Sequence, residues 1–147
     1  MMASICLEAE RAEEISLDAG FTNKLFGRID QSIAMAALFT AHHLGCKAIL
    51  ALTESGSTAL WMSRHKVHVP IYGLTSKLNS QRKMALYRNV RPLLMPNFTD
   101  RDQALACAEG LLVEQGVLKP GDTYAITVGE PMGYPGGTNM LKVCRVA

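Results

Sequence analysis

Short apolar runs alternate with segments of helical spacing along most of this chain, and that order constrains the fold more than any other feature. Strands that alternate with helices in this way form a parallel sheet with helices on both faces. The final run, 139–146, follows its neighbour after a loop too short for a crossover helix, so we expect it to pair antiparallel. The sequence thus predicts a three-layer α/β/α sandwich around a mixed sheet of about five strands. The runs before the last one are residues 47–52, 69–74, 90–95 and 122–128.

The ends of the helices can also be predicted from single residues. Asp30 is a good N-cap for a long helix that Gly45 is placed to end. Asn89 is expected to stop the basic helix before the third strand in a left-handed conformation. Thr99 and Asp102 resemble a capping pair at the start of the last helix.

The totals of the chain argue against several classes of protein. Its 147 residues suit one domain, and 48% hydrophobic with 19% charged residues argue against disorder. A net charge of +2 gives no reason to expect nucleic acid or an anionic membrane as a partner. No apolar stretch is as long as a membrane span, and the N-terminus lacks the pattern of a signal peptide, so we expect a cytoplasmic protein.

The residues that carry catalysis or bind metals in other proteins are not arranged for those roles here. The cysteines are scattered without a C-x-x-C pair, so we expect reduced thiols rather than a disulfide framework or a metal site. No nucleophile is spaced with a base, and no G-x-x-x-x-G-K-[ST] motif occurs. We therefore expect no catalytic residue and no metal ligand in this chain. The cysteines are Cys6, Cys46, Cys107 and Cys144.

A turn of small and hydroxyl residues joins the first predicted strand to the helix that follows it. Backbone N–H groups at a helix start favour an anion, hydroxyls can add hydrogen bonds, and glycine lets the backbone approach closely. The turn therefore predicts a phosphate site. An ordinary helix cap is the alternative, because Ser and Thr are common there, and the residues alone leave both open. The candidate phosphate contacts are Thr53, Ser55, Gly56, Ser57 and Thr58.

Five segments along the chain form a specific combination, although each one alone would be weak. They are Ala34-Met35-Ala36, His43-Leu44-Gly45, residues 52–59, Lys119-Pro120-Gly121-Asp122 and Gly136-Gly137-Thr138-Asn139. Together they resemble the C-terminal, regulatory domain of pyruvate kinase, and the resemblance covers about residue 2 to the end of the chain.

The resemblance implies that the catalytic barrel and the lid domain of that enzyme are missing here. Residues 1–27 would be the helix and connector that lead out of the barrel, and residues 28–147 the α/β domain. The parent enzyme would transfer phosphate from phosphoenolpyruvate to ADP with Mg²⁺ and usually K⁺. This chain alone would bind no cofactor and would be inactive. The resemblance also implies a homo-oligomer, a dimer or tetramer, that packs partly through this domain.

For the site, the resemblance implies that the turn binds a phosphate of an allosteric sugar phosphate. A glycine-rich loop, residues 129–137 here, would close over the same ligand. This loop has no Arg or Lys, Ala104 lies near the position of the family's helical arginine, and Glu54 adds negative charge. Two phosphates would be poorly paired, which favours a monophosphate such as ribose 5-phosphate, glucose 6-phosphate or AMP. The candidate loop contacts are Gly133, Tyr134 and Gly136.

Two other functions stay open at this point. A free-standing enzyme acting on a sugar phosphate could use the same turn for its substrate. It would need a general base near the turn, and Glu54 is the only close candidate. A domain that serves only subunit assembly could carry the turn as a vestigial pocket.

Overall fold

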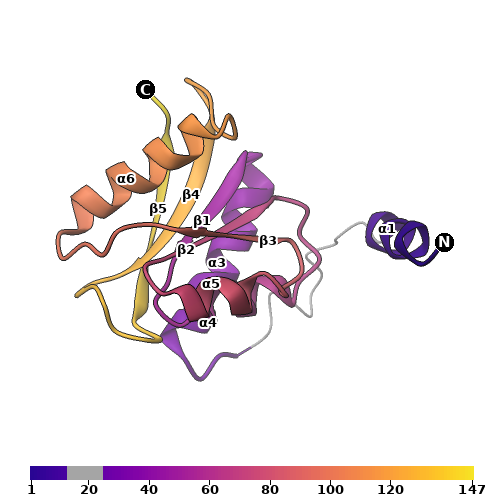
Figure 1. Cartoon of the computed structure of the whole chain (residues 1–147), viewed down its shortest axis with the longest axis horizontal. Coiled ribbons are helices and arrows are strands. Elements are labelled where there is room, and N and C mark those ends of the chain that lie inside the picture. The colour runs from indigo at the N-terminus through magenta and orange to yellow at the C-terminus, as the bar shows by residue number, and fades with distance from the viewer. Residues whose placement is uncertain (13–24) are drawn as a thin grey trace.

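Helices and strands alternate along the chain as the sequence predicts, in a computed structural model that describes residues 1–12 and 25–147 (Figure 1). The first helix, α1, precedes the part of the chain that the structure leaves undescribed, and α3 follows it. The elements are α1 (Met2–Ala12), α3 (Ile29–Leu44), β1 (Ala48–Leu52), α4 (Ser57–Ser63), β2 (Ile71–Thr75), α5 (Leu78–Met84), β3 (Val90–Leu94), α6 (Arg101–Glu114), β4 (Thr123–Gly129) and β5 (Thr138–Arg145).

The strands form one mixed sheet in the order β3-β2-β1-β4-β5. β1 pairs in parallel with β2 on one side and β4 on the other, and β2 pairs in parallel with β3. β5 pairs antiparallel with β4, because the short loop between them leaves no room for a crossover helix. The predicted mixed sheet with an antiparallel last strand is therefore confirmed.

Helices cover both faces of the sheet, which confirms the three layers (Figure 1). On one face, Leu38 of α3, Met62 of α4 and Met84 of α5 pack with Ile49 of β1. On the other face, α6 packs its apolar side onto alternate residues of the same strands. A fully buried Leu or Ile contributes about 1.5–3 kcal/mol, so these two clusters hold the layers together. The second cluster includes Leu50, Leu74, Leu112, Leu118 and Ile126.

One predicted helix end is confirmed, a second is wrong in position, and two predicted caps are wrong. Gly45 ends α3 with φ 63°. Asn89 adopts the predicted left-handed conformation with φ 60°, but α5 already ends at Met84, with Ala85 as its C-cap. Asp30 does not cap α3, because Arg28 occupies the N-cap position and Asp30 lies buried in the first turn. The cap of α6 is Asp100, whose side chain accepts from the backbone N–H of Asp102, so the predicted Thr99–Asp102 pair is not formed.

The N-terminal region is described only in part. α1 lies in residues 1–27, where a helix followed by a connector was expected, and its Ile5 and Leu7 are exposed. The predicted irregular connector after it falls mostly in 13–24, outside the described residues, so the proposed boundary at residue 27 stays a prediction. None of the helices described is long and apolar enough to cross a membrane.

Candidate anion-binding site

A pocket opens at the carboxyl ends of the parallel strands, between the segment that follows β1 and the segment that follows β4. Ligands of open α/β sheets bind outside the carboxyl ends of strands at such a switch point. Thr53 and Glu54 line the pocket after β1, and the glycine-rich loop after β4 contributes Gly133, Tyr134 and Gly136. Phe98, from the connection between β3 and α6, also lines it. The pocket therefore brings the start of the turn together with the predicted loop, whereas Ser55, Gly56, Ser57 and Thr58 do not line it.

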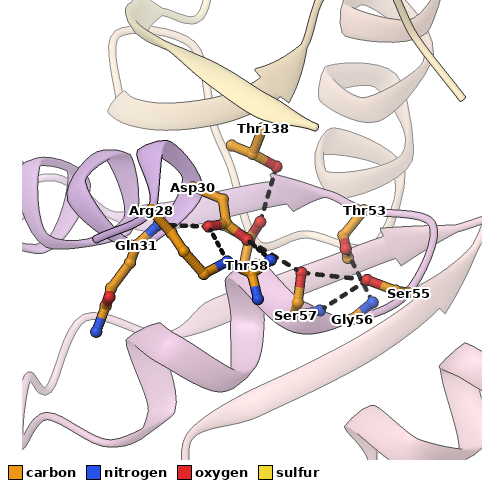
Figure 2. Close-up of polar contacts among 9 residues, drawn as sticks. All are labelled: Arg28, Asp30, Gln31, Thr53, Ser55, Gly56, Ser57, Thr58 and Thr138. Atoms are coloured by element: carbon orange, nitrogen blue, oxygen red, sulfur yellow. Dashed lines mark hydrogen bonds and ion pairs between the residues drawn. The ribbon is translucent and has the colours of Figure 1, made fainter. Parts of the chain in front are cut away.

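The turn satisfies its own backbone donors in this state (Figure 2). Gly56 N–H donates to Thr53 Oγ1 at 2.9 Å, and Ser57 N–H donates to Ser55 Oγ at 3.3 Å. Gly56 adopts φ 85°, a conformation that favours glycine, which lets the chain enter α4. A phosphate that bound these N–H groups would therefore have to displace the hydroxyls that accept from them. The bond from Ser57 N–H is the longer of the two and so the weaker.

Thr58 ties the start of α4 to β5. Its side chain is 0% exposed, and its hydroxyl lies 2.7 Å from that of Thr138, the first residue of β5. This contact fixes the turn next to the end of the glycine-rich loop (Figure 2). The hydroxyl of Thr58 could reach a ligand only by leaving Thr138.

Asp30 and Arg28 join the turn in a way that the sequence analysis did not foresee. Asp30, only 2% exposed, accepts from Arg28 Nε at 3.0 Å and from Arg28 Nη2 at 2.8 Å. It also accepts from the backbone N–H of Gln31 at 2.9 Å and, at 3.5 Å, from the hydroxyl of Ser57 (Figure 2). The start of α3 is thereby connected to the turn. An acid two residues after an arginine carries no recognisable signal for this arrangement.

The glycine-rich loop approaches the same group of residues. A Cβ placed on Gly136 would lie 2.9 Å from Arg28 Nη2, so the absence of a side chain lets the guanidinium pack there. Gly133 and Gly136 both have positive φ angles, 94° and 68°. Tyr134 is 67% exposed at the pocket rim. A Cβ on Gly129 would lie 2.6 Å from the carbonyl oxygen of Gly137, so the two ends of the loop are in close backbone contact.

Cations from distant positions stand near the pocket, and each is paired with a carboxylate. Lys77 Nζ lies 3.8 Å from Glu54, which also accepts from Ser76 at 3.5 Å. Arg101, at the start of α6, lies 3.9 Å from Glu130 of the loop and 3.2 Å from Asp102. Ala104 is buried in the core, as befits its place on the inner side of α6.

Other candidate groups lie away from the pocket. Trp61 is half-buried, with Arg64 4.6 Å and Arg28 5.9 Å from its ring centre. Burial, together with a hydrogen bond to Glu109, raises the pKa of Tyr124 far above its ordinary value. Across residues 1–12 and 25–147, His, Cys, Asp and Glu form no group of three that could hold a metal ion.

Comparisons with known proteins agree on one family. A family model described as the α/β domain of pyruvate kinase matches residues 31–144. The pyruvate kinase of Buchnera aphidicola subsp. Baizongia pistaciae is 35% identical over 147 residues, covering 99% of this chain but 31% of the relative. Pyruvate kinase II of Salmonella typhimurium is 35% identical over 99% of this chain and 30% of its own length. The pyruvate kinase of Staphylococcus haemolyticus is 34% identical over 97% of this chain and 24% of its own length. The chain thus spans less than a third of the curated relatives it matches.

Proposed function

Because the chain belongs to the family of pyruvate kinase α/β domains, we propose that it is the regulatory domain of a pyruvate kinase and binds a phosphorylated effector. The effector would lie in the pocket between the turn and the glycine-rich loop. Its phosphate would contact Thr53, Ser55, Gly56, Ser57 and Thr58, and its remaining part would face Gly133, Tyr134 and Gly136. The observation that carries the proposal is that Thr53, at the start of the turn, lines one pocket with the three loop residues at the carboxyl end of the sheet.

The paired cations favour an effector with one phosphate. Lys77 already faces Glu54, which lines the pocket, and Arg101 already faces Glu130 of the loop. A second phosphate would gain little from cations that are already neutralised, and it would be repelled by Glu54. We therefore propose a monophosphate, such as ribose 5-phosphate, glucose 6-phosphate or AMP, in preference to a sugar bisphosphate.

The proposal extends to the parent enzyme. A parent pyruvate kinase would transfer phosphate from phosphoenolpyruvate to ADP in the cytoplasm, with Mg²⁺ and K⁺ bound outside this chain. The residues described here offer no cluster of metal ligands, so this chain alone is expected to be inactive. An effector that ties the turn to the loop would favour one subunit arrangement of a homo-oligomer, a dimer or tetramer, over another.

A specific observation also supports an assembly-only domain as the second candidate. The turn is complete without a ligand, because its own hydroxyls occupy the N–H groups of Gly56 and Ser57. A vestigial pocket would show the same closure. The free-standing enzyme is disfavoured, since Glu54, its only candidate base, is engaged by Lys77 and Ser76.

Thermal unfolding with added ligand tests the proposal. A ligand present at 100 times its Kd stabilises the folded state by about 2.7 kcal/mol, which raises Tm by roughly 5–10 °C for a domain of this size. We expect that shift with ribose 5-phosphate, glucose 6-phosphate or AMP, and a smaller one with fructose 1,6-bisphosphate. Ser55→Asp should abolish it by like-charge repulsion. Gln115→Glu, which adds the same charge at the exposed end of α6, should not.

The outcomes separate the three functions. No shift with any phosphorylated ligand would support the assembly-only domain instead. Turnover of a sugar phosphate by this chain alone would support the free-standing enzyme. A shift that survives Ser55→Asp would place the ligand elsewhere and contradict the proposed site.

A further inference from the structure

We infer that Arg28 is the cation that selects a phosphate at this site, where it also neutralises the buried carboxylate of Asp30. The inference rests on the proposed function, because it names a specificity-determining residue for the same ligand. Neither residue lies in the turn or the glycine-rich loop. Both come from the start of α3, yet the fold brings them against both segments (Figure 2).

The geometry leaves part of the guanidinium available. Arg28 uses Nε and Nη2 to hold Asp30, and its side chain is 54% exposed. Within the described residues, Nη1 takes part in neither bond, so its two N–H groups are left for other acceptors. Arginine is suited to this double task, because its planar fork can bind one carboxylate on one edge and present further donors on another.

Burial keeps the guanidinium in place. The side chain of Asp30 is 1% exposed, and a buried carboxylate that loses its cation becomes strongly unfavourable. Arg28 therefore stays on Asp30 whether or not a ligand is bound. Its position is further fixed by Gly136, whose missing side chain provides the space against Nη2.

The charges explain why a phosphate would need this arginine. Asp30 lies 3.5 Å from the hydroxyl of Ser57, so a phosphate at the turn would approach a buried negative charge. Arg28 lies against that same carboxylate oxygen at 2.8 Å and neutralises it. A site without Arg28 would thus repel the ligand, while a site without the charge of Asp30 would attract it more strongly.

The loss of Arg28 and the loss of the Asp30 charge should change the affinity for a phosphate in opposite directions, and this difference gives the test. Titration of the folded chain with ribose 5-phosphate, followed by calorimetry, should show about tenfold weaker binding for Arg28→Gln. Asp30→Asn, which keeps a hydrogen-bonding side chain, should bind more tightly, by roughly threefold to tenfold. Lys47→Gln is the matched control for loss of one positive charge. Lys47 is exposed just before β1, at the end of that strand away from the turn. The affinity of this variant for ribose 5-phosphate should change less than twofold. Free ribose should not distinguish the variants.

A fluorescence measurement distinguishes a specific loss of binding from a general loss of folded structure in the variants. Trp61 is the only tryptophan of the chain, and Arg28 lies 5.9 Å from its ring centre, so ligand binding should change its fluorescence in the wild type and less in Arg28→Gln. The double variant Arg28→Gln/Asp30→Asn removes both charges together and should keep Tm near that of the wild type. Its affinity should lie between those of the two single variants.

Each result decides something. Weaker binding in both single variants would mean that the pair is merely structural, and equal binding in Arg28→Gln would mean that Arg28 contributes nothing; either overturns the inference and leaves the proposed function standing. If the wild type binds no phosphorylated ligand at all, the proposed function and this inference fail together.

Discussion

The buried contact between Thr58 and Thr138 gives a stability prediction that can be worked out from the structure. The two hydroxyls lie 2.7 Å apart, and their side chains are 0% and 6% exposed. Valine has the shape of threonine without the hydroxyl. Thr58→Val or Thr138→Val would therefore leave the packing intact and strand one buried hydroxyl, which costs about 1–3 kcal/mol. Each single variant should lose about 2 kcal/mol of the free energy of unfolding.

The double variant separates this contact from packing. Replacing both partners with apolar groups of the same shape is close to neutral, so Thr58→Val/Thr138→Val should lose about 1 kcal/mol or less. The interaction energy of the cycle should then be about 3 kcal/mol, at the upper end of the range seen for residues in contact. Thr99→Val, at an exposed position, should change stability by less than about 0.5 kcal/mol.

Urea unfolding followed by the fluorescence of Trp61 and by circular dichroism measures these values. The slope of the transition should be unchanged, because the surface exposed on unfolding is the same. Losses that add to within about 0.5 kcal/mol in the double variant would refute the reasoning, since the two hydroxyls would then not depend on one another. The start of α4 would in that case not be held to β5 by this contact.

Four further outcomes follow from glycines and cysteines. Gly129→Ala should destabilise the fold by about 1–3 kcal/mol in urea unfolding, because its Cβ would lie 2.6 Å from the backbone oxygen of Gly137. Gly110→Ala, on the exposed side of α6 with open space around it, should instead stabilise by about 0.5–1 kcal/mol. A thiol reagent should modify exposed Cys6 well before buried Cys46. Burial raises the pKa of the Cys46 thiol above its ordinary value of 9.0. The contribution of Cys46 to the free energy of unfolding is therefore complete below pH 9.0 and is lost as pH rises through the folded-state pKa. Between pH 8.5 and 10, Cys46→Ala should therefore lose stability less steeply than the wild type.

Much of the fold could be predicted because local patterns determine it. The apolar runs gave the strands, and the length of the loop after β4 gave the antiparallel pairing of β5. The left-handed conformations of Gly45 and Asn89 were predicted correctly, since few residues adopt that conformation, although α5 ends before Asn89. These features depend on residues close together in the sequence, which is why the residues alone were sufficient.

The prediction for Asp30 was wrong because its environment is set by tertiary contacts. As a cap, it would have bonded only to the N–H groups of its own helix. Instead it is held by Arg28 and reaches Ser57, which lies 27 positions along the chain. Lys77 and Arg101 likewise come to the pocket only through the order of the strands. No periodicity in the sequence encodes which distant charge will face which loop.

The chemistry of the turn explains why the sequence could not decide between a phosphate site and a simple cap. The same hydroxyls that would bind a phosphate can also bond to the N–H groups that would face it, and in this state Thr53 and Ser55 do so. An empty anion site must satisfy its buried donors in some way, because an unpaired buried N–H costs about 1–3 kcal/mol. Closure of the turn on itself is therefore compatible with both functions.

What distinguishes the two functions is the charge around the turn. A cap needs no cation beside it, whereas a phosphate brought close to Asp30 does. Arg28 occupies that position and keeps donors beyond those that Asp30 requires. Because binding would exchange the bond between Ser57 and Ser55 for one to the ligand, its net gain would come mostly from Arg28 and only slightly from the turn. The affinity for a phosphate should therefore follow the charges at the start of α3 more closely than the hydroxyls of the turn.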